Sequence, residues 1–296
     1  MGLPMAERVV KAGFETFTTY HHRREPADLL SAMGATVMAT PALVARAADV
    51  IITIVPADAE LKEVVLGANG VLEGFSPGKV LIDMTSATVM SMQEVERALV
   101  GVGGRVLDAP VSGGTTGAAR GTLTIMVGGD PALLEECRPL LETMGSKIVH
   151  VGAVGQGKVV KMVNQMMAAV HLMTIGEAFT LGVRCGANPA TLYEVIKSSS
   201  GYSKMMDLRL PGFLLAGSFQ AGFKLDLMKK DVNIALDSGR ANGVPLLLAS
   251  TVAQIFSAAS AAGKGSEDYS CAAQFLADMV QVQLSQPDSD RRAAGK

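Results

Sequence analysis

The sequence has no tryptophan, three cysteines, four histidines and a net charge of only −2. The cysteines are odd in number and far apart, which predicts plain thiols in a reducing, cytoplasmic setting. The histidines form no HxxxH or HExxH pattern, so we expect no metal site. Because neither sign of charge dominates, nucleic acid and anionic membranes are not expected as partners.

A long apolar stretch covers residues 162–183, and it is interrupted by Asn164, Gln165, His171 and Glu177. These polar side chains predict a buried central helix of a folded domain, not a membrane span.

The first half of the chain alternates strand-like and helix-like segments. Continuous apolar runs at 49–55 and 79–83 are typical of buried parallel strands. Further strands are expected at 15–20, 36–38, 105–108, 123–127 and 147–151, with helices at 4–13, 27–33 and 90–100. Strands separated by helices predict a doubly wound, Rossmann-type parallel sheet.

From about residue 157 the pattern is helical almost throughout, with breaks at glycine and proline. We therefore predict an α/β domain over residues 1–152 and an all-helical domain over residues 153–285. The polar residues 286–296 are expected to form a flexible tail.

The beginning of the chain does not match a whole dinucleotide-binding unit. Such a unit opens with a strand and a GxGxxG turn, which meets the pyrophosphate at a helix N-terminus. Here the chain starts with Met1-Gly2-Leu3-Pro4 and goes straight into a helix, so Gly2 would be the last glycine of that turn. We expect the first strand and glycine turn, about ten residues, to be missing from this sequence.

A polar trio stands at the start of the long apolar helix. Lys161, Asn164 and Gln165 are three and four residues apart, so they are expected on one helix face. Partial desolvation at a positive helix start disfavours the charged form of lysine, which suits proton transfer. The alternative is that Lys161 reaches from a buried helix to water and Asn164 caps a neighbouring loop.

Three other segments are candidates for ligand contacts. Ser112-Gly113-Gly114 follows a strand end, where backbone N–H groups and a hydroxyl can approach a carboxylate, although a plain Gly-Gly turn has the same pattern. Val55-Pro56 and Ser86 follow successive strands and would face the crevice where a dinucleotide lies. Taken alone, Lys230-Asp231 is typical of a solvated helix surface.

Together these motifs resemble those of the β-hydroxyacid dehydrogenase family, which includes 3-hydroxyisobutyrate dehydrogenases and 2-hydroxy-3-oxopropionate reductases. The resemblance covers residues 1 to about 285. It rests on four segments in the family's order: Met1-Gly-Leu-Pro-Met-Ala6, Asp108-Ala-Pro-Val-Ser-Gly-Gly114, Gly155-x-Gly157-x-x-x-Lys161-x-x-Asn164, and Lys230-Asp231 with Ala235 and Asp237.

The resemblance implies an NAD(P)-dependent enzyme that interconverts a small 3-hydroxy acid and its semialdehyde by hydride transfer. It implies that Lys161 is the general acid/base. The implied substrate-binding residues are Ser112, Gly113, Gly114, Asn164, Gln165 and Asp231. The implied cofactor-binding residues are Gly2, Met5, His22, Arg23, Val55, Pro56, Ser86 and Lys230. The family's usual second asparagine after Asn164 is Gln165 here, which leaves room for a different substrate contact.

The choice between NADP and NAD is expected at the segment Tyr20-His21-His22-Arg23-Arg24. An acid at this place would bind the ribose 2′-hydroxyl of NAD, whereas arginine accommodates the 2′-phosphate of NADP. The segment itself contains no acid, since the next one in the chain is Glu25, and two arginines can pair a phosphate, so the segment favours NADP. Solvated surface charge is the alternative.

Two other functions remain open at this stage. The segments Pro245–Thr251 and Gly265–Tyr269 also resemble the L-threonate dehydrogenase branch, in which histidine tends to replace Asn164. A non-catalytic oligomerising protein of the same fold is the second alternative. The apolar helical half predicts a homodimer or homotetramer in each case.

Overall fold

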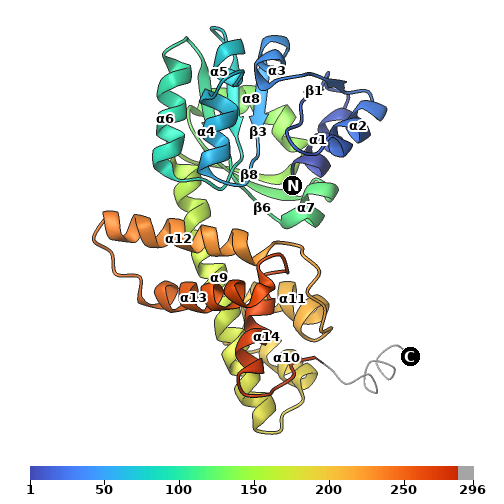
Figure 1. Cartoon of the computed structure of the whole chain (residues 1–296), viewed down its shortest axis with the longest axis vertical. Helices are drawn as coiled ribbons and strands as arrows, with labels where there is room; N and C mark the ends of the chain where they lie inside the picture. The colour runs from blue at the N-terminus through green and yellow to red at the C-terminus, as the bar shows by residue number, and fades with distance from the viewer. Residues whose placement is uncertain (286–296) are drawn as a thin grey trace. The chain divides into compact units, whose positions relative to one another are not determined.

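The computed structural model describes residues 1–285, which form two compact units (Figure 1). The first unit is Met1–Met162, and the second begins at Val163. The predicted tail at 286–296 lies outside the described residues.

The first unit contains eight strands and most of the shorter helices. Its strands are β1 (Phe17–Thr18), β2 (Thr36–Val37), β3 (Val50–Thr53), β4 (Val80–Asp83), β5 (Arg105–Asp108), β6 (Val111–Ser112), β7 (Leu123–Gly128) and β8 (Gly145–Gly152). Its helices are α1 (Gly2–Lys11), α2 (Glu25–Ala32), α3 (Pro41–Ala47), α4 (Asp58–Leu66), α5 (Val71–Gly74), α6 (Val89–Val100), α7 (Gly114–Arg120) and α8 (Pro131–Glu142).

The strands form two sheets in the described residues. β1 and β2 pair in parallel as a two-stranded sheet, and the six-stranded sheet has the order β3-β4-β5-β7-β6, with β8 beside β7. The pairs β3–β4, β4–β5 and β7–β8 are parallel. β7 runs antiparallel to β5 and β6, because the chain turns back after Ser112 through the short helix α7.

Alternate residues of the buried strand β4 point to opposite faces of the larger sheet. Val80 and Ile82 join the cluster that α1 and α8 complete, whereas Leu81 joins the cluster of α3, α4, α5 and α6. Figure 1 shows these helices around the sheet. The predicted α/β class is therefore confirmed, with helices on both faces of a mostly parallel sheet.

The second unit is all-helical in its described part. It contains most of α9 (Gln156–Arg184), then α10 (Pro189–Lys197), α11 (Lys204–Arg209), η1 (Leu210–Leu214), α12 (Leu225–Ala241), α13 (Leu247–Ala259), η2 (Ser260–Lys264) and α14 (Cys271–Asp278). One hydrophobic cluster joins these helices. By length and composition α9 could cross a membrane, but Leu172, Met173 and Phe179 on it belong to this cluster, as in a core helix.

Candidate active site

The start of α9 depends on two glycines that other residues could replace only with strain. Gly155 has a φ of +96°, a conformation that L side chains rarely adopt. A Cβ on Gly157 would lie 2.6 Å from Asp108 Oδ2 and 2.6 Å from the Met126 carbonyl oxygen. Glycine at both positions therefore lets the helix begin directly against the strand ends. Lys161 follows one turn later and is half-buried.

A buried charged cluster that the sequence reading missed holds this helix start in the first unit. Lys158 Nζ donates to Asp83 Oδ2 at 2.7 Å, to the Asp83 carbonyl at 3.0 Å and to the Thr85 carbonyl at 2.9 Å. The side chains of Lys158 and Asp83 are 1% and 0% exposed. Thr53 Oγ1 donates to the other Asp83 oxygen at 2.7 Å. Hence every polar atom of this pair has a partner, as a buried ion pair requires.

Asp108, at the end of β5, completes the cluster. Its carboxylate accepts from the backbone N–H of Gly155 at 2.9 Å and of Lys158 at 2.8 Å, so it caps α9 from a strand end. Burial raises the pKa of the Asp108 carboxyl, and the nearby Lys158 and the two N–H donors partly oppose this rise. One signal was available in the sequence: Asp83 and Asp108 end two successive predicted strands, and Lys158 directly follows the Gly155-x-Gly157 segment.

In the second unit, four predicted site residues form one polar chain. Asn164 Nδ2 donates to Gln165 Oε1 at 3.2 Å, and Gln165 Nε2 donates to Asp231 Oδ2 at 2.7 Å. Lys230 Nζ forms an ion pair with Asp231 Oδ1 at 3.0 Å. Gln165 and Asp231 are buried, whereas Asn164 and Lys230 are half-buried. The structure thus brings residues 66 positions apart into contact through Gln165, the residue that departs from the family's asparagine.

The predicted Ser112-Gly113-Gly114 segment joins β6 to α7. Ser112 is half-buried and the two glycines are exposed. Gly113 and Gly114 have φ values of +138° and +64°, and a Cβ on Gly113 would lie 3.0 Å from Leu123 Cδ2. Backbone conformation and packing therefore both explain the glycines, and they leave the loop's backbone accessible.

The predicted cofactor residues of the sheet lie at two adjacent strand ends. Val55-Pro56 follows β3 and Ser86 follows β4, and these strands pair in register from Val50–Val80 to Thr53–Asp83. The Val55 N–H donates to Thr85 Oγ1 at 3.2 Å, which ties the two ends together.

Helix α1 carries two further predicted residues. Gly2 is its first residue, and a Cβ there would lie 3.3 Å from Ile54 Cγ2, just past the end of β3. The first turn of α1 contains no acidic residue and no side-chain cap, which fits an anionic group such as a pyrophosphate. Met5 is 2% exposed and packs in the core, so its predicted cofactor contact stays a prediction.

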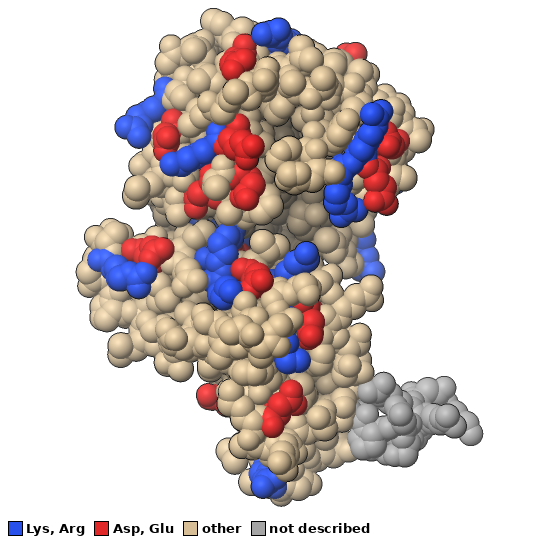
Figure 2. All heavy atoms as spheres, viewed as in Figure 1, with Lys and Arg blue, Asp and Glu red and all other residues tan. Residues whose placement is uncertain are grey.

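The predicted cofactor-selecting segment lies between β1 and α2. The rings of His21 and His22 are 3.7 Å apart. Arg23 pairs with Glu25 at 3.2 Å, and Arg24 with Asp28 at 3.1 Å, at exposed positions. Basic and acidic side chains are similarly interspersed over the face in Figure 2. Exposed pairs of this kind are weak, so both arginines can exchange partners.

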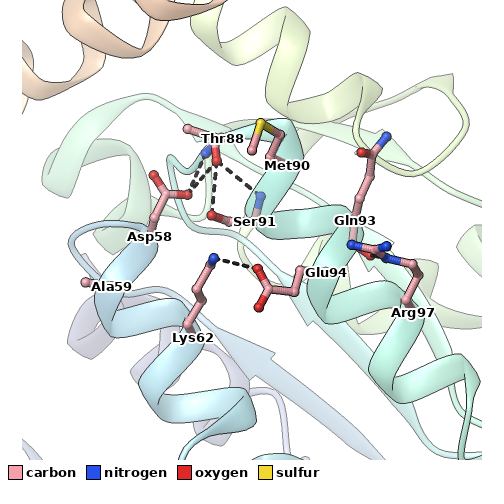
Figure 3. Close-up of a pocket in the computed structure, with 9 residues that line it drawn as sticks. All are labelled: Asp58, Ala59, Lys62, Thr88, Met90, Ser91, Gln93, Glu94 and Arg97. Atoms are coloured by element: carbon pink, nitrogen blue, oxygen red, sulfur yellow. Dashed lines mark hydrogen bonds and ion pairs between the residues drawn. The ribbon is translucent and has the colours of Figure 1, made fainter.

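A separate pocket of about 430 Å³ lies between α4 and α6 (Figure 3). Lys62 and Glu94 form an exposed ion pair in it at 2.5 Å, and Asp58 Oδ1 accepts from the N–H and the hydroxyl of Thr88 at 2.9 Å each. Asp58 thereby holds Thr88, whose hydroxyl caps α6 by accepting from the Ser91 N–H at 3.2 Å. None of the predicted site residues lines this pocket.

Comparisons with known proteins match both halves of the chain. Residues 1–152 match the family model for the NAD binding domain of 6-phosphogluconate dehydrogenase. Residues 155–276 match the model for the NAD-binding region of NADP-dependent 3-hydroxyisobutyrate dehydrogenase.

Individual relatives match over nearly their whole length. 2-(Hydroxymethyl)glutarate dehydrogenase of Eubacterium barkeri is 37% identical, over 96% of this chain and 94% of that protein. 2-Hydroxy-3-oxopropionate reductase of Escherichia coli is 34% identical, over 96% and 97%. The structure of Mycobacterium tuberculosis 3-hydroxyisobutyrate dehydrogenase with L-serine has a TM-score of 0.85 at 34% identity, over 93% of this chain and 95% of that one.

Proposed function

Because the chain belongs to the β-hydroxyacid dehydrogenase family, we propose that it interconverts a small 3-hydroxy acid and its semialdehyde, with Lys161 as general acid/base. The family establishes the enzyme class and the cofactor: an oxidoreductase that uses NAD or NADP and acts on the hydroxyl group of a hydroxy acid. The substrate and the role of each residue belong to the proposal.

The substrate class is proposed from chemistry that the relatives' names share. 3-Hydroxyisobutyrate, 2-(hydroxymethyl)glutarate and the reduction product of 2-hydroxy-3-oxopropionate each carry a primary alcohol on the carbon β to a carboxylate. A site for such a compound needs one carboxylate-binding element and one proton-transfer group. In this chain the Ser112–Gly114 loop would bind the carboxylate through backbone N–H groups and the Ser112 hydroxyl.

The observation that carries the proposal is the arrangement of α9. Lys161 stands half-buried one turn after a helix start that is fixed to the sheet, and Asn164 follows it on the same face. Bound NAD(P) supplies the hydride acceptor or donor. Lys161 Nζ would take the hydroxyl proton during oxidation and return it during reduction. Asn164 would orient the substrate oxygen, held in turn by Gln165 and Asp231.

The test is a panel of 3-hydroxy acids and semialdehydes, with L-threonate included, assayed with NADPH and with NADH. Lys161→Ala should lower kcat by about 10²- to 10⁴-fold while the Kd for NADPH, followed by nucleotide fluorescence, stays unchanged. A small primary amine added to Lys161→Ala should restore part of the rate. Turnover by Lys161→Ala within threefold of the parent would refute the acid/base role, and selective turnover of L-threonate would replace the substrate class.

A preference for NADP is proposed from Arg23, with His22 beside it. Arg23→Ala should raise the KM for NADPH by about tenfold or more and leave the KM for NADH unchanged, because a charge-assisted contact to the 2′-phosphate is lost. Equal changes for both cofactors would indicate a general disturbance of the segment.

Self-association is proposed from exposed apolar residues of the second unit. Val163, Met167 and Leu181 lie on one face of α9 at heptad-like spacing, with 42%, 50% and 67% exposure. Leu247 and Leu248 on α13 are 77% and 71% exposed. Apolar surface of this kind marks an interface, and we propose a homodimer or homotetramer in the cytoplasm. Light scattering of the parent and of Leu181→Asp would give the order and test the surface.

A further inference from the structure

Asp108 connects two parts of the proposed site that are far apart in the sequence. Its carboxylate accepts from Gly155 N and Lys158 N at the start of α9, and it is fully buried. The backbone that follows it continues, four residues later, into Ser112 and the glycine loop. One side chain therefore joins the strand end that leads to the loop with the helix that carries Lys161.

Other helices of this chain obtain the same kind of cap locally. Asp130 caps α8 by accepting from Ala132 N at 2.7 Å, and Asn188 caps α10 by accepting from Ala190 N and Thr191 N. These residues directly precede the helices that they cap. Asp108, the cap of α9, instead lies 47 positions before Gly155 and 50 positions before Lys158. A local cap stabilises a helix, whereas this cap also fixes the helix to one place on the sheet.

Close packing leaves this contact little freedom. Gly157 has no Cβ, and one would lie 2.6 Å from Asp108 Oδ2 and 2.8 Å from its carbonyl oxygen. Lys158, the residue that Asp108 caps, is in turn anchored by its Nζ to Asp83 and Thr85. Because Lys161 stands one turn beyond these anchors on a continuous helix, its position relative to the loop follows from them.

We infer that Asp108 is a positioning residue for the reaction, which sets Lys161 relative to the Ser112–Gly114 loop within the first unit. This inference rests on the proposed function. Asp108 touches neither substrate nor cofactor in this account; it acts through the backbone of Gly155 and Lys158. A shift of the order of 1 Å in a proton-transfer group can cost about a hundredfold in rate.

The test replaces Asp108 with asparagine in the full-length protein. The amide can accept only one of the two N–H bonds, and its NH₂ group faces the other donor. We expect kcat at 25 °C to fall tenfold or more, the Kd for NADPH to stay within twofold, and the KM for substrate to change less than kcat. Asp58→Asn is the matched control, because the Asp58 carboxylate likewise accepts two hydrogen bonds at the start of a helix of the first unit, from the N–H and hydroxyl of Thr88, the N-cap residue of α6. It should lower the thermal midpoint comparably and leave kcat unchanged.

Gly157→Ala is the second variant, which displaces the helix start while keeping every polar group. If Asp108→Asn does not fold, Gly157→Ala tests the inference in its place. It too should lower kcat while NADPH binding is retained. A kcat within twofold of the parent in either folded variant would overturn the inference. So would equal losses of kcat in Asp108→Asn and Asp58→Asn. Lys161→Ala is run alongside: if that variant keeps its turnover, the proposed function itself fails and this inference with it.

Discussion

Replacing Lys158 by methionine should destabilise the first unit strongly. Methionine fills much of the same volume but removes Nζ, which donates to Asp83 Oδ2, to the Asp83 carbonyl and to the Thr85 carbonyl. The Asp83 carboxylate then stays fully buried with only Thr53 Oγ1 and the Thr85 N–H as donors. Its counter-charge is gone.

The size of the effect follows from burial. Removing one partner of a buried ion pair typically costs about 3–5 kcal/mol, since the remaining charge has no compensation. For a unit of this size about 1 kcal/mol lowers the thermal midpoint by roughly 2–4 °C, so a fall of about 6–20 °C is expected. Lys62→Met makes the same change in a pair whose side chains are 43% and 45% exposed. It should cost at most about 1 kcal/mol.

Differential scanning calorimetry of both variants measures the difference. The double variant Lys158→Met with Asp83→Asn should recover part of the loss, because it removes the uncompensated charge and keeps an acceptor for Thr53. If Lys158→Met loses no more than Lys62→Met, the buried cluster is not a stabilising element and the reasoning fails.

Two further predictions use other ionisable groups. Iodoacetamide at pH 8 should label exposed Cys185 and leave buried Cys137 and Cys271 unlabelled. Burial raises the pKa of both buried thiols, that of Cys271 to about 12, so little reactive thiolate forms there. Mass spectrometry of the labelled native protein checks this, and fast labelling of Cys271 would contradict it. Hydrogen bonds from Tyr193, the larger cause, and from Tyr202 lower the pKa of Asp207. These bonds therefore stabilise the folded protein fully above the ordinary pKa range of aspartate, and the stabilisation is lost as the pH falls through the lowered pKa. Tyr193→Phe should therefore lower the thermal midpoint at pH 7 more than at about pH 3, and an equal loss at both would point to packing alone.

Hydrophobic periodicity and continuous apolar runs were enough to predict the α/β class and most strands of the first unit. The expected runs at 79–83 and 105–108 correspond closely to β4 and β5. The pattern did not predict α7, because its sequence GTTGAAR carries no large apolar residue. Nor did it predict α4, although Leu61, Val64 and Val65 stand at helical spacing there. It also did not predict the reversal of β7, since a strand's own sequence does not record the direction of its neighbours.

The candidate site likewise has features that the sequence predicts and contacts that it does not. Glycines and the lysine segment are local signals, and they could be read directly. The contacts Gln165–Asp231 and Lys158–Asp83 join residues 66 and 75 positions apart, and no spacing rule specifies such a pair. The sequence did not indicate the role of Lys158 for a physical reason. Lysine side chains as buried as this one are rare, so a lysine is expected at the protein surface.

The distant cap of α9 also bears on the order of folding. The amides of Gly155 and Lys158 obtain their acceptor only when β5 is in place, and Lys158 Nζ obtains its own only when β4 has formed. Closing such long loops costs chain entropy before any contact rewards it. The first turn of this helix should therefore consolidate late, after the sheet, with φ-values near zero for substitutions at Asp108. The part of α9 that carries Lys161 would then be among the last parts of the chain to reach its native geometry.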